Sequence, residues 1–360
     1  MTQQDKDSHK TKRFFYTLDG IRGLAAILVA IFHTQPFFGS ERFEESYLAV
    51  DIFFLLSGVV IANAYEQRLL SGLETWRFAL MRVVRIYPLY VLGCMITVLS
   101  MVSGIGESTD AKTLLSSLAL ALFILPGTIS EHAFPLNGPS WSLFFEILAN
   151  IFYAGFVRFL NVRNLIRIMC VSVLGIILGL YLGHTHAIDF GWTLKGWPFG
   201  IFRVGYSFFA GVLIYRSFKS GACPVNIHRR QGSFIPITIV ALVGVLLTSS
   251  PPAALHPYFD SLMVFIIFPA IIYAALFFEP VGIIARVFQF LGTISYAVYA
   301  LHWPLAYLIR DYLKNLCGIL VDDYRPWSGI VLIVSLIIAC WLIDKIYDTP
   351  VRRFLMSYLK

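Results

Sequence analysis

The chain has 360 residues, of which 58% are hydrophobic, 16% aromatic and only 14% charged. Soluble domains usually carry about 25% charged residues, so this composition excludes an ordinary water-soluble globule. The net charge is +7, which we assign to membrane orientation and lipid headgroups, with no nucleic acid as a partner. The five cysteines show no metal-ligand spacing, and no metal cofactor is expected.

Eleven apolar segments follow one another along the chain, and most are long enough to cross a bilayer as helices. They cover approximately residues 18–38, 47–64, 86–103, 112–127, 141–159, 165–183, 197–216, 234–250, 258–278, 288–309 and 327–347. The sequence therefore predicts an all-α, polytopic transmembrane bundle over residues 16–351. Residues 1–15 and 352–360 are expected to form short tails outside it.

Basic residues indicate the orientation of this bundle, because cytoplasmic connections are enriched in Lys and Arg. Such residues precede the first segment and follow the second, fifth, seventh and eleventh. Both termini should then be cytoplasmic, which requires an even number of crossings. We predict ten, with the short segment 112–127 re-entrant or enclosed within the bundle.

The first segment carries ionisable residues that are costly inside a membrane and therefore need a reason. Arg22 and His33 are eleven residues apart, close to three helical turns, and so share one helix face at an axial separation of about 16 Å. Asp19 lies within reach of Arg22. For Arg22 this pattern is compatible with a cation that anchors an anionic donor or with an ordinary cytoplasmic positive charge. For His33 it favours a general base over a structural core histidine.

The second segment begins with Asp51 and continues to Ser57-Gly58. Asp51 is expected either to orient His33, as carboxylates do in other base–orienter pairs, or to form a structural hydrogen bond. Ser57 and Gly58 indicate close helix packing, and a nucleophilic Ser57 is the less favoured interpretation.

Arg82 and Arg85 lie one helical turn apart before the third segment. Paired guanidinium groups at a membrane boundary suit phosphate groups, although lipid headgroups would satisfy them equally well.

The fifth segment opens with Trp141 and Ser142 and holds Glu146 about a turn further along. A buried glutamate needs a partner, so Glu146 should bind an acceptor hydroxyl or pair with Arg203 of the seventh segment. In the tenth segment, Tyr299 and His302 share a face, and His302 is either a second polar group of the site or a structural hydrogen-bonding residue.

Five motifs occur together in chain order: 18–26 continuing to His33, 50–58, 82–88, 141–146 and 295–304. With them, the chain resembles the acyltransferase 3 family of O-acetyltransferase-like transmembrane acyltransferases over about residues 16–351. The resemblance implies acyl-CoA, in particular acetyl-CoA, as the donor. It also implies transfer to a hydroxyl of a glycan or glycolipid in a bacterial inner membrane, with polysaccharide-synthesis proteins as potential partners.

The predicted site combines the residue patterns with this resemblance, which makes His33 catalytic and places the three arginines near the donor. We expect catalytic roles for His33, Asp51 and Glu146, donor binding by Arg22, Arg82 and Arg85, and acceptor binding by Trp141, Ser142, Arg203, Tyr299 and His302. Direct attack of the hydroxyl on the thioester is the expected route, and a transient acyl-histidine is the alternative. A rival interpretation is a transporter whose intramembrane Arg, His and Glu line a translocation path.

Overall fold

The structure is a computed structural model that describes residues 15–39, 43–106, 109–127, 131–183, 187–221 and 230–359. Within these residues the strands are the two-residue β1 (Arg230–Gln231) and β2 (Phe278–Glu279), which pair in parallel. All other regular structure is helical. The prediction of an all-α bundle is therefore confirmed.

Thirteen α-helices account for the described part of the bundle. In chain order they are α1 (Tyr16–His33), α2 (Ala49–Leu70), α3 (Thr75–Val102), α4 (Ala111–Leu122), α5 (Trp141–Phe156), α6 (Val162–Gly183), α7 (Gly200–Lys219), α8 (Phe234–Leu247), α9 (His256–Leu262), α10 (Phe268–Ala275), α11 (Gly282–Cys317), α12 (Trp327–Ile343) and α13 (Thr349–Ser357). The 3₁₀ turns are Gln35–Phe37, Glu44–Leu48, Gly138–Ser140, Trp197–Phe199, Ala253–Leu255 and Val321–Tyr324. The π-helical turns Met263–Ile267 and Asp344–Asp348 join α9 to α10 and α12 to α13.

Each of the eleven predicted apolar segments is helical, and several of the helices extend beyond the predicted segments. Helix α3 begins at Thr75, so Arg82 and Arg85 lie inside a helix rather than in a cytoplasmic loop. Helix α13 continues to Ser357, so the expected C-terminal tail is mostly helical. Both extensions mix basic and apolar residues, and their average hydropathy is too low to mark them as apolar segments. The expected N-terminal tail falls largely outside the described residues.

Among the residues that the structure describes, eight helices are long and apolar enough to cross a membrane. They are Tyr16–His33, Glu44–Leu70, Thr75–Val102, Val162–Leu182, Trp197–Lys219, Ala253–Ala275, Gly282–Cys317 and Trp327–Ser357. Helix α4 has only 12 residues, or about 18 Å of helix, against a hydrocarbon core of roughly 30 Å. The shortness expected of segment 112–127 is thus confirmed, while the count of ten crossings stays a prediction.

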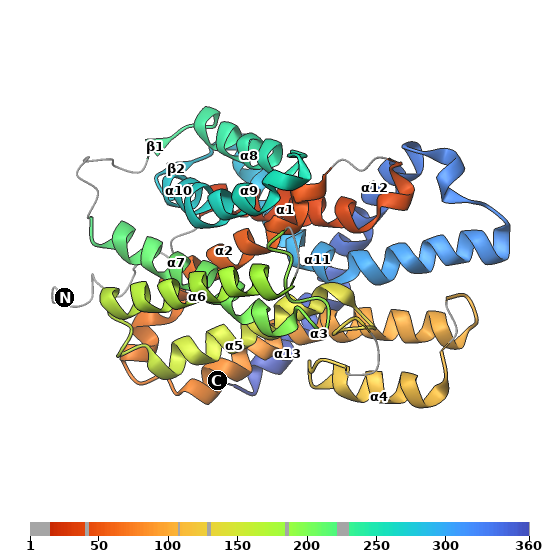
Figure 1. The fold of residues 1–360 in the computed structure, drawn as a ribbon, viewed down its shortest axis with the longest axis horizontal. Coiled ribbons are helices and arrows are strands. Elements are labelled where there is room, and N and C mark those ends of the chain that lie inside the picture. The colour runs from red at the N-terminus through yellow and green to blue at the C-terminus, as the bar shows by residue number, and fades with distance from the viewer. Residues whose placement is uncertain are drawn as a thin grey trace, which may run out of the picture.

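Helices α1, α2 and α7 lie between two groups of helices (Figure 1). Helices α8, α9 and α10 gather along one edge, and α3, α4 and α5 lie along the opposite edge. Helix α1 packs most extensively on α11, and α2 packs most extensively on α7. The central helices α1 and α2 carry several of the predicted site residues.

Glycines set the contact between α2 and α7. A Cβ atom on Gly58 would lie 2.0 Å from the Phe208 carbonyl oxygen, and one on Gly211 would lie 2.1 Å from the Leu55 carbonyl oxygen. No side chain can be accommodated at such distances, so the two backbones are in direct contact, as small residues allow in membrane helices. The close packing predicted from Ser57-Gly58 is confirmed.

Candidate active site

Two cavities lie along the predicted site residues. The first, which we call the arginine cavity, has a volume of about 110 Å³ and is lined by Arg22, Arg82, Arg85 and Glu146. The second, which we call the histidine cavity, has a volume of about 390 Å³ and is lined by His33. Arg22 and His33 are thus presented by one helix, as predicted, but they line different cavities.

Arg22 is held at the arginine cavity by two contacts. One of its guanidinium nitrogens donates to Asp19 Oδ1 at 2.6 Å and to the Gly292 carbonyl oxygen at 3.1 Å. The predicted contact between Asp19 and Arg22 is therefore confirmed. The approach of α11 here is close, because a Cβ on Gly292 would lie 2.5 Å from the Asp19 side chain.

Arg82 and Glu146 form the second charged group of this cavity. Arg82 donates to Glu146 Oε1 at 2.9 Å, and the Ser57 hydroxyl donates to the same oxygen at 2.9 Å. The predicted alternative of a Glu146–Arg203 pair is wrong, because α5 packs Glu146 against α3 at this point. Arg82 is buried and Arg85 is exposed, so the pair combines a fixed cation with an accessible one. Three guanidinium groups against one cavity carboxylate make this cavity suitable for a polyanion.

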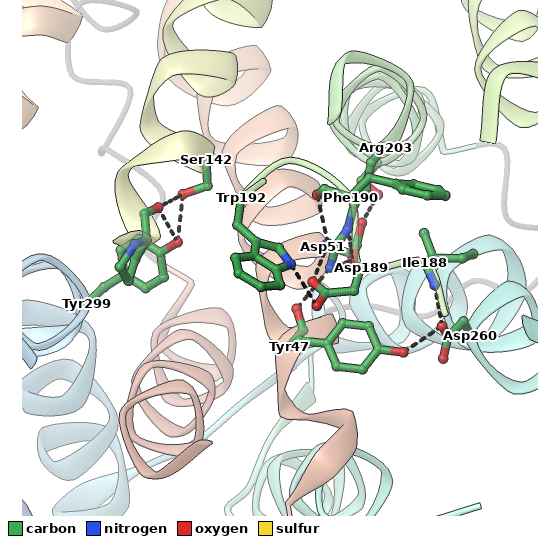
Figure 2. Close-up of polar contacts among 12 residues, drawn as sticks. Tyr47, Asp51, Ser142, Ile188, Asp189, Phe190, Trp192, Arg203, Asp260 and Tyr299 are labelled. Atoms are coloured by element: carbon green, nitrogen blue, oxygen red, sulfur yellow. Dashed lines mark hydrogen bonds and ion pairs between the residues drawn. The ribbon is translucent and has the colours of Figure 1, made fainter. Parts of the chain in front are cut away.

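The two cavities share Val50 and Tyr299 among their lining residues. The Tyr299 hydroxyl lies 2.6 Å from the Ser142 hydroxyl and donates to the Pro139 carbonyl oxygen at 3.1 Å. Figure 2 shows Ser142 and Tyr299 facing one another from separate helices. Ser142 lines the arginine cavity, whereas its neighbour Trp141 lines the histidine cavity. These residues therefore form the boundary between the two spaces.

His33 forms its principal polar contact with His302. His33 Nδ1 lies 2.9 Å from His302 Nε2, and the two rings stack with a centroid distance of 5.1 Å. His302 Nδ1 lies 3.0 Å from the Val298 carbonyl oxygen, which can only accept, so Nδ1 of His302 carries its proton. Nε2 of neutral His302 then accepts from Nδ1–H of His33. This arrangement leaves Nε2 of His33 unprotonated and able to act as a base.

The expected contact between Asp51 and His33 is not formed. Asp51 Oδ2 accepts two hydrogen bonds from Arg203, at 2.7 and 2.9 Å, and Ser207 donates to the other carboxylate oxygen. Both members of the ion pair are fully buried. Arg203 is therefore a partner of Asp51, and it does not appear among the described lining residues of either cavity. The direct acceptor contact predicted for Arg203 has no support in this geometry.

His302 also differs in position from its expected acceptor-binding role. It is fully buried and lies behind His33, outside the described lining of both cavities. A position behind the base makes His302 a positioning residue rather than a residue that touches the acceptor.

Aromatic side chains and one carboxylate complete the histidine cavity, and the sequence analysis missed most of them. The aromatic members that join His33 are Phe32, Tyr47, His132, Phe134, Trp141, Trp192, Tyr299, Trp303 and Tyr307. The carboxylate belongs to Asp189, which lies in the connection between α6 and α7. Connections carry no helical periodicity, so the sequence offered no pattern by which Asp189 could be placed.

The pKa of the Asp189 carboxyl lies above its usual range, and burial is the largest cause. Arg203 and the hydrogen bond from Trp192 counteract part of this pKa shift. Trp192 Nε1 donates to Asp189 Oδ2 at 3.0 Å, and an Arg203 nitrogen lies 3.8 Å from Oδ1 (Figure 2).

Comparison with known proteins gives two kinds of match. The model of the acyltransferase domain family matches residues 15–345. "Protein 2 in picA locus" of Rhizobium radiobacter is 36% identical over 173 residues, which cover 44% of this chain and 90% of that protein. Peptidoglycan O-acetyltransferase OatA of Listeria monocytogenes is 22% identical over 95% of this chain, which spans only 56% of OatA. No solved structure matches the chain.

Proposed function

Because the chain belongs to the acyltransferase family whose model covers residues 15–345, we propose that it transfers an acetyl group from cytoplasmic acetyl-CoA to a glycan hydroxyl. The peptidoglycan O-acetyltransferase activity named for OatA supports a glycan as the acceptor. In this proposal His33 is the general base. The observation that carries it is that α1 presents Arg22 to one cavity and His33 to the next.

The arginine cavity is the proposed donor site. Arg22, Arg82 and Arg85 would bind the phosphate groups of acyl-CoA, for which guanidinium groups are suited by charge and geometry. The basic connections predict that this end of the bundle faces the cytoplasm, where acyl-CoA is made. The pantetheine arm is thin and mostly uncharged, so it can reach the reaction centre while the nucleotide stays outside.

The histidine cavity is the proposed acceptor site. His33 Nε2 would remove the proton of the acceptor hydroxyl, whose oxygen then attacks the thioester carbonyl carbon. The carbon–sulfur bond breaks, and the departing thiolate takes its proton from the His33 imidazolium. His302 keeps its acceptor Nε2 toward His33 throughout, which holds the ring in the reactive tautomer.

Direct transfer is favoured over an acyl-histidine intermediate, although both use the same unprotonated nitrogen. In direct transfer the acyl group moves once, across the boundary formed by Val50 and Tyr299. Glu146 then serves to hold Arg82 and Ser57 in place, since its Oε1 accepts a hydrogen bond from each.

Replacing His33 tests this proposal in purified protein reconstituted into vesicles. Supplied with acetyl-CoA and a peptidoglycan-derived glycan, His33→Ala should lose about 10²- to 10⁴-fold in transfer rate, the range that a general base supplies. Donor binding should be unchanged, because His33 lies outside the arginine cavity. Transfer at the normal rate by this variant would eliminate the proposal, and absence of thioester cleavage by the wild type would favour a transporter.

A further inference from the structure

The two cavities differ in charge as well as in size. Three arginines line the arginine cavity, whereas the described lining of the histidine cavity contains one carboxylate, from Asp189, and neither lysine nor arginine. A site without a cation has no group to neutralise an acidic ligand. Selection for charge is therefore built into the second cavity.

Asp189 is held in a fixed position by its own contacts and by its connection. Its side chain is 35% exposed and receives the indole N–H of Trp192 at 3.0 Å. The backbone beside it is anchored where Ile188 N donates to Asp260 Oδ2 at 2.7 Å and where Ala133 N donates to the Trp192 carbonyl oxygen at 2.9 Å. A carboxylate fixed in this way can accept further hydrogen bonds from a ligand without first being ordered.

Arg203 neutralises Asp189 only in part, because its shorter contacts are with Asp51. Its guanidinium group lies 2.7 Å from Asp51 and 3.8 Å from Asp189, so one cation faces two carboxylates. Asp260 adds a third carboxylate behind Tyr47, whose hydroxyl donates to it at 2.6 Å. Figure 2 shows these groups gathered on one side of the site, away from Ser142 and Tyr299.

The cavity also offers flat apolar surfaces beside this carboxylate. Trp192 stacks on His132 with a centroid distance of 5.4 Å, and Trp303 packs edge-on against His33 at 5.3 Å. Aromatic rings provide apolar faces that can pack against the C–H surfaces of a sugar ring. A sugar ring placed there could donate hydrogen bonds from its hydroxyls to Asp189, while the hydroxyl that reacts faces His33.

We propose that Asp189 selects and orients the acceptor, and that the histidine cavity takes a neutral or amino sugar in preference to an acidic one. This inference rests on the proposed function and identifies the class of sugar that the site accepts. Hydroxyl or ammonium groups of the sugar donate to the Asp189 carboxylate. A carboxylate or phosphate on the same ring meets a like charge and binds more weakly, by about tenfold or more.

Binding measured without any donor tests this selection separately from catalysis. The cavity is lined by Trp141, Trp192 and Trp303. The intrinsic fluorescence of the full-length protein in detergent should therefore change when it is titrated with methyl glucoside, methyl glucosaminide or methyl glucuronide. The wild type should bind the first two at least about tenfold more tightly than the glucuronide. Asp189→Asn should remove most of this difference. Asp322→Asn is the matched control, since Asp322 is an exposed aspartate paired with Arg325 outside the cavity lining.

Two results would overturn the inference. One is a wild type that binds the glucuronide as tightly as the glucoside, and the other is a preference that Asp189→Asn leaves intact. If Asp189→Asn does not fold, Trp192→Phe is the second variant, because it removes the indole N–H that donates to Asp189 and keeps an aromatic ring. It should reduce the difference in affinity between the glucoside and the glucuronide. If the binding preference is found but no sugar is acetylated, the proposed function fails and the selection by Asp189 stands.

Discussion

The hydroxyl groups of Tyr299 and Ser142 lie 2.6 Å apart at the boundary between the two cavities. Tyr299 lines both cavities, and Ser142 lines only the arginine cavity. The aromatic ring of Tyr299 therefore lies between the proposed donor site and the proposed acceptor site. An acyl group that reaches His33 has to pass this ring.

Tyr299→Ala should open this boundary and admit water to the thioester. We expect acetyl-CoA hydrolysis in the absence of acceptor to rise severalfold, measured as release of free thiol. Tyr307→Ala is the matched control because Tyr307 lines only the histidine cavity. Equal hydrolysis by Tyr299→Ala and the wild type would show that the ring is not the barrier.

His302 should affect the rate of transfer and not the affinity for either substrate. Replacement by Ala leaves His33 Nδ1 without its acceptor, so the reactive tautomer is no longer favoured. We expect kcat to fall by about 10²-fold, the lower end of what a positioned base supplies, with KM for donor and acceptor nearly constant. His302→Gln, which retains an acceptor atom, should recover part of the rate.

A double variant checks that the two histidines act as one unit. His33→Ala combined with His302→Ala should be no slower than His33→Ala alone, because residues that act together are not additive. A further large loss in the double variant would assign His302 a separate role.

Arg85 should contribute to donor affinity. It is exposed and lines the arginine cavity, so Arg85→Ala should raise KM for acetyl-CoA by about 10- to 100-fold, the equivalent of one charge-assisted hydrogen bond. Acceptor KM should not change. Arg77→Ala removes the same charge from the same helix at an exposed position paired with Glu74, outside the cavity lining, and should leave both constants unchanged. An equal effect of both variants would point to general electrostatics instead.

Asp51 should matter for stability rather than for proton transfer. Breaking a fully buried ion pair leaves an uncompensated charge and costs about 3–5 kcal/mol, so Asp51→Asn should lower the unfolding temperature in detergent. The variant that remains folded should keep a near-normal kcat. If Asp51→Asn instead has a normal unfolding temperature and no activity, the result would support the original expectation that Asp51 orients His33.

The sequence predicted helices and helix faces well because hydropathy and a period of 3.6 residues are local properties. It placed Arg22, Arg82 and Arg85 correctly as a group, since α1 and α3 each present their own polar face. It predicted the contact between Asp19 and Arg22 within one helix, but it did not predict which polar residues pair between helices. Asp51 pairs with Arg203 because α2 packs on α7. Glu146 pairs with Arg82 because α5 packs on α3. Helix pairing is a property of the whole bundle and is not encoded in residue spacing.

The same limit applies to His33 and His302. Each was recognisable as a polar residue in an apolar segment, but their contact depends on the packing of α1 against α11. Glycines make this packing close, since a Cβ on Gly23 would lie 2.3 Å from the Leu291 side chain. Such glycines are visible in the sequence, although the partner helix of each is not.

The glycine contact between α2 and α7 determines which side of the passage can move. Gly58 and Gly211 leave no space for these helices to slide, and the buried Asp51 pair joins them a second time. We therefore expect Val50, at the start of α2, to keep its position. If the passage between the cavities widens during transfer, we expect the side chain of Tyr299 or helix α11 to move. A bulky residue at Gly58 should then lower activity by separating α2 from α7, without contacting either substrate.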